Sequence, residues 1–298
     1  SCHGLASAVK SLEKGAAVEL ETEDNVLRVR SGRLSLSFPT LPVEDWPELK
    51  QHKVEAKFQI PAAELERMLS TVNHAISTEE THYYLNGVFF NITHDKKFGV
   101  VATDGHRLGL STMEIPKGAA KMTRGVIVPR LAVRTLLGLL KKAKGNVGIV
   151  VRETTILFAV GDTTLHTKQI DGNFPDYTRV IPADNDIHMT AKRDDLAGVI
   201  DRLSKFSDGG FRLTLTPGNA AFWVRTPGDG EATESIDVEF KSAGAEFEIG
   251  FNGKYLAAIL KSIDSDTVVV DFSDAAGPFI TRDPHDDTAL HVQMPMRV

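Results

Sequence analysis

The sequence predicts an α+β fold built from repeated domains, in which helices are followed by antiparallel strands. One helical pattern recurs three times, starting at Leu5, Leu131 and Leu256. The copies lie about 125 residues apart, which is an ordinary size for one domain. In each copy apolar residues return at helical intervals, and a run of β-forming residues follows.

Segments that alternate apolar and polar residues follow each of the three helices, as half-buried strands do. We expect three strands after each helix, at residues 17–20, 26–30, 34–38, then 147–151, 155–160, 164–170, and finally 268–272, 277–282, 289–294. Turn-forming residues such as Gly161 and Asp162 separate them. The repeating unit is therefore one helix and three strands.

A second, related unit stands between these copies, beginning at Phe58 and again at Met189. Each start leads into a predicted helix, with apolar side chains at Leu65, Met68 and Leu69 in the first and at Leu196, Val199 and Ile200 in the second. Strands are expected at 87–92, 99–103, 108–113, 211–216, 221–226 and 235–240.

Linkers rich in proline and aromatic residues, at 38–47 and 174–182, close the repeats. We therefore expect half a domain at residues 1–52 and full domains at 53–182 and 183–298. Repetition further predicts three domains in the intact protein, with this chain beginning inside the first.

The composition, 42% hydrophobic and 25% charged, is that of a soluble globular protein. We expect a cytoplasmic location, because no long apolar run predicts a membrane span and no secretion signal is visible. Cys2 is the only cysteine, which excludes an intramolecular disulfide and a cysteine-based zinc cluster. A chain terminus is also a poor setting for a catalytic thiolate.

The net charge of −6 argues against a simple nucleic-acid binder with an overall basic surface. The predicted helix at 129–144 is different, because it contains no acidic residue. Its apolar residues Val133, Leu136 and Leu140 share one face, and another face carries the basic residues Arg130, Arg134, Lys141 and Lys144. Such a face fits a surface that follows a phosphate backbone, and a solvated helix face explains it equally well.

The sharpest motif is Asp104-Gly105-His106-Arg107, on a predicted turn between two strands. An aspartate two residues from a histidine is compatible with acid–base or metal chemistry, but no second histidine cluster of ligand spacing accompanies it. We expect a structural or partner-binding turn, and no catalytic residue, metal or cofactor. The alternatives are a metal-dependent hydrolase using Asp104 and His106, or a repeat scaffold that does not bind DNA.

Five segments resemble a known family in order and spacing: 83–87, 102–108, 171–177, 249–252 and 294–297. The family is the bacterial DNA sliding clamp, the beta subunit of DNA polymerase III, and the resemblance covers the whole chain. It implies a head-to-tail homodimer around duplex DNA, with helices lining the hole and antiparallel sheets outside. It also implies a non-catalytic processivity factor that tethers the replicative polymerase, and further binds the clamp loader, other polymerases and repair proteins.

The resemblance places a pocket for short linear peptides between the second and third domains. The matching positions are Leu85, Thr103, Gly105, His106, Arg107, Leu108, Pro175, Arg179, Val180, Val292, Met294, Pro295, Met296 and Arg297. It places His82, Tyr83 and Arg130 near the DNA path, which Arg134 and Lys141 would extend. The segment Ser207–Phe211 departs from the family's charged pattern at the dimer interface, where we expect Phe206 and Phe211. Because half of domain one is absent, we expect the pocket to survive while ring closure weakens.

Overall fold

The computed structural model describes residues 2–45, 53–206, 209–226, 228 and 230–298. Trp46 and Pro47 of the first linker, and Ser207 and Asp208 of the expected interface segment, lie outside these residues. The chain forms two compact units, Ser1–Gln51 and His52–Val298. No helix in the described ranges has the length and apolar character needed to cross a bilayer.

The first unit contains one α-helix and a three-stranded antiparallel sheet in the order β1-β2-β3. Its elements are α1 (Cys2–Lys10), β1 (Glu19–Glu23), β2 (Val26–Ser31), β3 (Leu34–Pro39) and η1 (Val43–Asp45). Asp24 and Asn25 join β1 to β2 with φ angles of 47° and 60°, the left-handed geometry of a tight hairpin turn. Val29 is buried in this sheet.

The second unit begins with a four-stranded sheet, ordered β11-β10-β9-β4, and two helices that pack on each other. The elements are β4 (Val54–Pro61), α2 (Ala62–Asn73), α3 (Arg130–Leu140), β9 (Asn146–Arg152), β10 (Thr155–Val160) and β11 (Thr163–Lys168). The predicted apolar faces of both helices are buried, which confirms their helical pattern. Helix α3 ends at Leu140, so Lys141 is its C-cap and Lys144 lies beyond it.

A nine-stranded sheet runs through the second unit in the order β16-β12-β18-β19-β20-β7-β6-β5-β8. Its strands are β5 (Gly87–Ile92), β6 (Phe98–Thr103), β7 (Arg107–Met113), β8 (Val126–Pro129), β12 (Ile187–Lys192), β16 (Glu239–Lys241), β18 (Thr267–Phe272), β19 (Phe279–Arg282) and β20 (Ala289–Gln293). The antiparallel pair β7–β20 joins strands that are far apart in the sequence.

A last four-stranded sheet has the order β15-β14-β13-β17 and packs with two further helices. Its elements are α4 (Arg193–Leu203), β13 (Gly210–Thr216), β14 (Asn219–Thr226), β15 (Gly230–Asp237), β17 (Phe247–Asn252) and α5 (Gly253–Leu260). The strand predicted at 235–240 is wrong in one respect: the chain leaves β15 for β16 around the buried Val238, and these two strands belong to different sheets.

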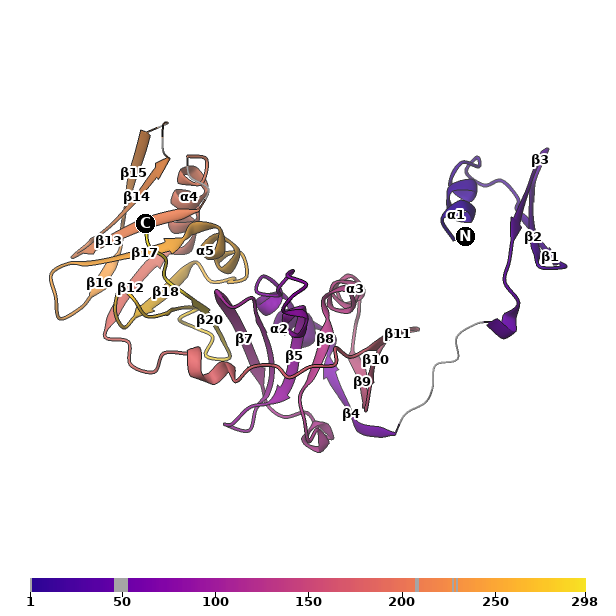
Figure 1. Ribbon diagram of the computed structural model, residues 1–298, viewed down its shortest axis with the longest axis horizontal. Coiled ribbons are helices and arrows are strands. Elements are labelled where there is room, and N and C mark those ends of the chain that lie inside the picture. The colour runs from indigo at the N-terminus through magenta and orange to yellow at the C-terminus, as the bar shows by residue number, and fades with distance from the viewer. Residues whose placement is uncertain (1, 46–52, 207–208, 227, 229) are drawn as a thin grey trace. The chain divides into compact units, whose positions relative to one another are not determined.

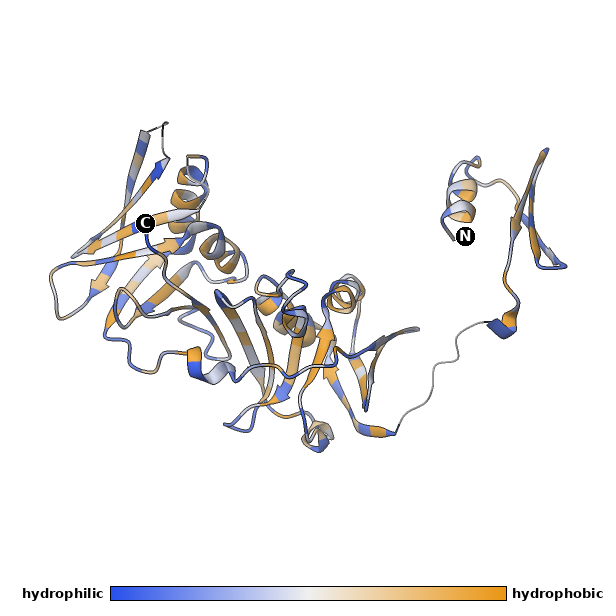
Figure 2. Cartoon of the chain, viewed as in Figure 1, coloured by the Kyte–Doolittle hydropathy of each residue, from blue (hydrophilic) through white to orange (hydrophobic). Residues whose placement is uncertain are grey.

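Side chains along the nine-stranded sheet point alternately to its two faces, so each face contributes to a different hydrophobic cluster. Ala102 of β6 faces the helices and joins the core beneath α2, whereas its neighbour Val101 faces the other side. Short 3-10 turns, η2 (Tyr83–Leu85), η3 (Ala119–Lys121) and η4 (Tyr177–Val180), complete the unit. Figure 1 shows the segment containing η4 crossing the side of the sheet away from the helices. Hydrophobic and hydrophilic bands alternate along the strands and helices in Figure 2.

Candidate functional site

A cavity of about 150 Å³ opens beside the β7–β20 pair. Ten of the residues predicted for a peptide pocket line it: Leu85, Thr103, Gly105, His106, Arg107, Leu108, Pro175, Val180, Val292 and Met294. Asp176 and Tyr177 also line it and were not predicted, although both lie in the recognised segment 171–177. The four remaining predicted residues, Arg179, Pro295, Met296 and Arg297, lie outside its lining.

The floor of the cavity is apolar because β7 and β20 present alternate side chains to the same face. Leu108 and Val292 pair across the two strands and are buried in one small cluster with Tyr177. At the mouth, Val180 and Met294 are 43% and 39% exposed. An apolar floor with a few polar groups at its rim is typical of a site that holds one apolar side chain of a ligand.

The wall of the cavity is the turn from Thr103 to Arg107. Gly105 has a φ of 88°, a left-handed conformation that glycine adopts without strain. Asp104 stabilises the turn, because its Oδ1 accepts hydrogen bonds from the backbone nitrogens of His106 and Arg107, both at 3.0 Å. Its Oδ2 accepts a third bond, of 2.9 Å, from Arg107 Nε.

This geometry argues against acid–base or metal chemistry at Asp104. Both of its carboxylate oxygens are already engaged within the turn, and the side chain is only 15% exposed. The His106 ring lies against the ring of Tyr255 rather than beside a second ligand. In the described ranges no group of three or more His, Cys, Asp or Glu side chains is arranged to hold a metal ion.

A strap formed by residues 174–180 borders the cavity on its other side. Asp176 caps the turn η4, accepting hydrogen bonds from Thr178 Oγ1 at 2.6 Å and from Arg179 Nε at 3.0 Å. The Thr178 hydroxyl and, to a smaller extent, Arg179 lower the pKa of Asp176. Tyr177 is buried, which raises its pKa, and its hydroxyl accepts a 3.0 Å hydrogen bond from Asn91 Nδ2. Arg179 itself is exposed.

The C-terminal residues form the remaining edge. Met294 donates its backbone N–H to the carbonyl of His106 at 2.8 Å, which connects β20 to the wall. Met296 donates to the carbonyl of Gly250 at 2.8 Å, so the tail lies along β17. A side chain at Gly250 would come within 2.2 Å of the Met296 carbonyl oxygen, so the tail needs glycine here. This path explains why Met296 does not line the cavity.

The structure leaves the basic residues of α3 and its C-cap, Lys141, exposed. Arg130, Arg134 and Lys141 are exposed, and the structure records no acidic partner for them in the described part of the chain. His82 and Tyr83 are exposed as well, at the turn η2. These positions are compatible with contact to a phosphate backbone.

The two phenylalanines expected at the dimer interface, Phe206 and Phe211, differ in how far they are exposed. Phe206 is 62% exposed, whereas Phe211 is completely buried in the core between β17 and α5. Its ring contacts Phe251, and a side chain added at Gly253 would collide with it. Phe211 therefore packs inside the domain, and we withdraw it from the expected interface.

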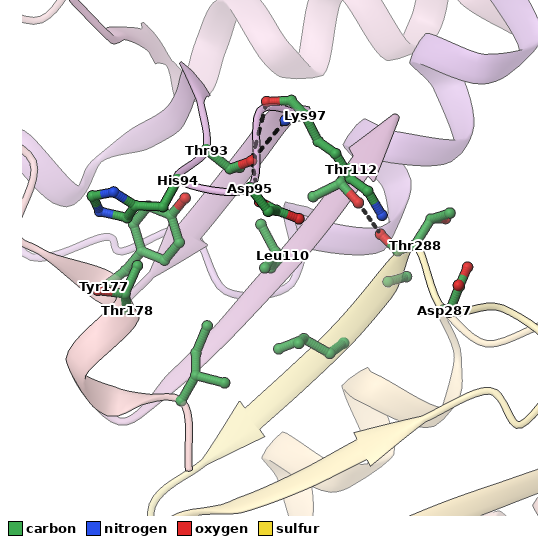
Figure 3. A pocket seen from close by; sticks show the side chains of 13 residues that line it. Thr93, His94, Asp95, Lys97, Leu110, Thr112, Tyr177, Thr178, Asp287 and Thr288 are labelled. Atoms are coloured by element: carbon green, nitrogen blue, oxygen red, sulfur yellow. Dashed lines mark hydrogen bonds between the residues drawn. The ribbon is translucent and has the colours of Figure 1, made fainter. Parts of the chain in front are cut away.

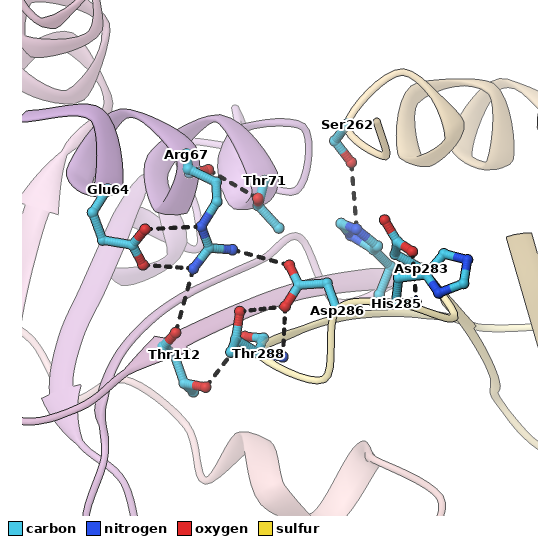
Figure 4. Close-up of polar contacts among 10 residues, drawn as sticks. Glu64, Arg67, Thr71, Thr112, Ser262, Asp283, His285, Asp286 and Thr288 are labelled. Carbon is cyan, nitrogen blue, oxygen red and sulfur yellow. Dashed lines mark hydrogen bonds and ion pairs between the residues drawn. The ribbon is translucent and has the colours of Figure 1, made fainter. Parts of the chain in front are cut away.

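The two halves of the second unit are also joined by polar contacts, drawn in Figure 4. Arg67 of α2 donates to Glu64 at 2.7 Å and to Asp286, in the loop before β20, at 3.2 Å. A further contact joins the halves, because His74 Nε2 lies 3.0 Å from Nδ1 of the buried His291. Neither histidine could be predicted as a contact from the sequence, because no motif or spacing marks them.

A second, larger cavity of about 250 Å³ lies on the other side of Tyr177. Figure 3 shows it between the β5–β6 turn, η4 and the start of β20. Most of the residues that line it are of polar or charged types, including Asp95, Lys97 and Asp287. None of the predicted pocket residues lines this cavity.

Comparison with known families gives two matches that together span most of the chain. Residues 59–176 match the family "DNA polymerase III beta subunit, central domain". Residues 178–297 match "DNA polymerase III beta subunit, C-terminal domain".

Individual relatives agree with these matches. The chain is 36% identical to the beta sliding clamp of Caulobacter vibrioides over 99% of this chain and 81% of that protein. It is 33% identical to the beta sliding clamp of Escherichia coli K12 over 97% of this chain and 78% of that protein. A solved DnaN sliding clamp from Bartonella birtlesii, bound to griselimycin, superposes with a TM-score of 0.94 at 38% identity, covering 99% of this chain and 80% of that one.

Proposed function

The chain belongs to the beta sliding clamp family, the beta subunits of DNA polymerase III, and on this premise we propose how it works. It is a non-catalytic processivity factor that encircles duplex DNA and tethers the replicative polymerase. Partners dock by inserting a short linear peptide, with apolar and aromatic anchors, into the cavity at the β7–β20 pair. The clamp loader, other polymerases and repair proteins use the same cavity in turn.

The proposal is supported above all by one observation: segments that are far apart in the sequence line the same cavity. The wall (Thr103–Arg107), the strap (174–180) and the last strand (β20) converge on one apolar hollow, although up to about 190 residues separate them. A catalytic role for the same residues is not supported, because both carboxylate oxygens of Asp104 already accept hydrogen bonds within the turn. A hollow of this size suits one anchor side chain, with the rest of the peptide lying across the surface.

Fluorescence polarisation of a labelled peptide with one leucine and one phenylalanine anchor tests the proposal. We expect saturable binding in the micromolar range, about 8 kcal/mol. Val180→Ser combined with Met294→Ser should abolish it, because both side chains lie at the cavity mouth and are exposed enough to be changed without unfolding the chain.

The matched control is Leu131→Ser, which changes another exposed apolar side chain outside the cavity lining. It should bind the peptide as the wild type does. Equal affinities for the wild type, the double variant and the control would show that the peptide does not use this cavity.

We further propose that the basic face of α3, with His82 and Tyr83, follows the DNA backbone. A variant with Arg130, Arg134 and Lys141 all changed to alanine should flatten the dependence of log K on log[salt] by about 3 units, since each lost phosphate contact removes ~0.9. A control that removes equal charge from exposed sites outside α3 is Lys117, Lys121 and Lys168 to alanine. Equal slopes for both triple variants would contradict this assignment.

The proposed domain organisation is a half-domain at 1–52 and full clamp domains at 53–182 and 183–298. The protein is then a head-to-tail homodimer, with Phe206 near the interface, and it works in the cytoplasm.

A further inference from the structure

The larger cavity, drawn in Figure 3, has an apolar floor and shares only Tyr177 with the cavity proposed for peptides. Leu110 of β7 and Leu290 of β20 pair directly across the two strands, and both line the cavity together with Ile181. All three side chains pack against the small apolar cluster that contains Tyr177. At about 250 Å³ the cavity has room for a small molecule with an apolar body.

The hydroxyl groups around this floor are already engaged inside the protein. Four threonines line the cavity, and the hydroxyl of each donates a hydrogen bond to a neighbouring oxygen. The donors Thr93, Thr112, Thr178 and Thr288 have as acceptors, in that order, Asp95, the carbonyl of Thr288, Asp176 and Asp286. Because a hydroxyl carries a single proton, these groups have no donor left for a ligand.

The charged groups at the rim are what remains for recognition. Asp95 accepts from the Thr93 hydroxyl, which lowers the pKa of Asp95, so this carboxylate is ionised at pH 7. Asp287 is exposed, and no partner is recorded for its carboxylate among the described residues. Lys97 is the one lysine or arginine in the described lining. Apart from His94, the rim therefore carries one more negative charge than positive.

The surroundings of Tyr177 are negative as well. Burial is the main cause that raises the pKa of Tyr177, and the charges of Asp95 and Asp176 raise it further, whereas the hydrogen bond from Asn91 lowers it. Carboxylates beside an aromatic ring favour a cation, because the face of the ring also attracts positive charge. An ionised carboxylate can only accept hydrogen bonds, so the matching ligand is a donor.

We propose that this cavity is a binding site for a small organic cation with an apolar body, such as an arylamidine or an alkylguanidine. The apolar body lies on the Leu110–Leu290 floor, and the cationic group faces Asp95 and Asp287. An anion would face both carboxylates at once, and a neutral molecule would gain nothing from them. The site is separate from peptide docking, so it does not depend on the proposed function.

Benzamidine, a flat aromatic cation, and benzamide, its neutral analogue, test the proposal. In a ¹H–¹⁵N titration we expect benzamidine to bind with a Kd of about 1 mM, the range for a ligand of this size. Benzamide should bind about fivefold more weakly, the upper value for an exposed charge pair. The backbone signals of Lys97, Thr112 and Leu290 should shift, because these residues line the cavity.

Two charge changes should act in opposite directions. Asp287→Asn removes a carboxylate from the rim and should weaken benzamidine binding about three- to fivefold. Lys97→Gln removes the lysine from the rim and should strengthen it by a similar factor. Damage to the fold would weaken binding in both variants. The matched control is Asp162→Asn, at an exposed carboxylate outside the lining, which should bind benzamidine as the wild type does.

Four results would overturn the proposal. No shift of the cavity signals at benzamidine concentrations on the order of 10 mM would exclude the site. Equal affinities for benzamidine and benzamide would exclude recognition of the charge. Equal weakening by Asp287→Asn and Asp162→Asn would mean that benzamidine responds only to the net charge of the chain. Loss of benzamidine binding in the Val180→Ser, Met294→Ser double variant would place it in the peptide cavity instead.

Discussion

Acid should weaken the fold through the buried histidine pair where α2 meets β20. His291 is 2% exposed, and its Nδ1 faces His74 at 3.0 Å while its Nε2 lies 3.4 Å from Ser262 Oγ. Burial lowers the pKa of His291 from 6.5 to about 4. Burial also lowers the pKa of His74, and the charges of His291 and Arg107 act in the same direction. Both imidazoles are therefore neutral in the folded chain at pH 7.

The size of the effect follows from the His291 shift. Between pH 6.5 and pH 4 the unfolded chain binds a proton at His291 that the folded chain excludes, so the free energy of unfolding falls as the pH is lowered. Above pH 6.5 the free energy of unfolding keeps this contribution in full. A shift from 6.5 to about 4 corresponds to about 3 kcal/mol in total, of which about 2 kcal/mol is lost by pH 5.

Urea denaturation at pH 7.5 and pH 5 measures this loss. The chain has two tryptophans, so a Trp46→Phe background leaves Trp223 in β14 as the only fluorescent reporter of that kind. His291→Asn cannot take up the proton, so it should lose about 2 kcal/mol less than the wild type between the two pH values. His285→Asn, at an exposed histidine, is the matched control and should follow the wild type. Identical pH dependence of the wild type and His291→Asn would show that protonation of His291 does not cause the loss of stability.

Three further changes have defined outcomes. Gly250→Ala places a methyl group within 2.2 Å of the Met296 carbonyl oxygen, so the tail should detach and the free energy of unfolding should fall by about 1 kcal/mol in urea melts, the value of one lost hydrogen bond. Gly148→Ala, with its nearest contact at 3.5 Å, should leave the free energy of unfolding unchanged. Gly138→Ala, exposed in the last turn of α3, should raise the free energy of unfolding by about 0.5–1 kcal/mol in urea melts, and a decrease would contradict the open space around Gly138. Asn252→Ala removes the cap of α5 and should lower the free energy of unfolding by about 1 kcal/mol, whereas no change would show that the cap is dispensable.

The repeated α+β organisation could be predicted because each helix buries one face and each strand alternates. Residues such as Leu65 and Val133 fell on the faces that the structure buries. Sheet membership could not be predicted in the same way, since a period of two does not say which neighbour a strand pairs with. The break at Val238, where the chain passes from one sheet to another, is the clearest example.

The residues of the candidate site were predicted mainly from the resemblance to the family, and less from the apolar and polar pattern of the sequence. The turn at 104–107 was visible as a motif, but its spatial neighbours, the strap and the last strand, were assigned by matching segments. The pair His74 and His291 was missed because no motif or spacing in the sequence marks either residue. Phe211 was misplaced for a related reason: a phenylalanine at the start of a strand looks alike in sequence whether it faces a core or a partner.

The most direct test of peptide docking is a crystal structure of the chain with the leucine- and phenylalanine-containing peptide. We expect one apolar anchor inside the cavity at the β7–β20 pair, in contact with Leu108, Tyr177 and Val292. A peptide seated instead in the larger cavity of Figure 3, with the β7–β20 cavity empty, would contradict it.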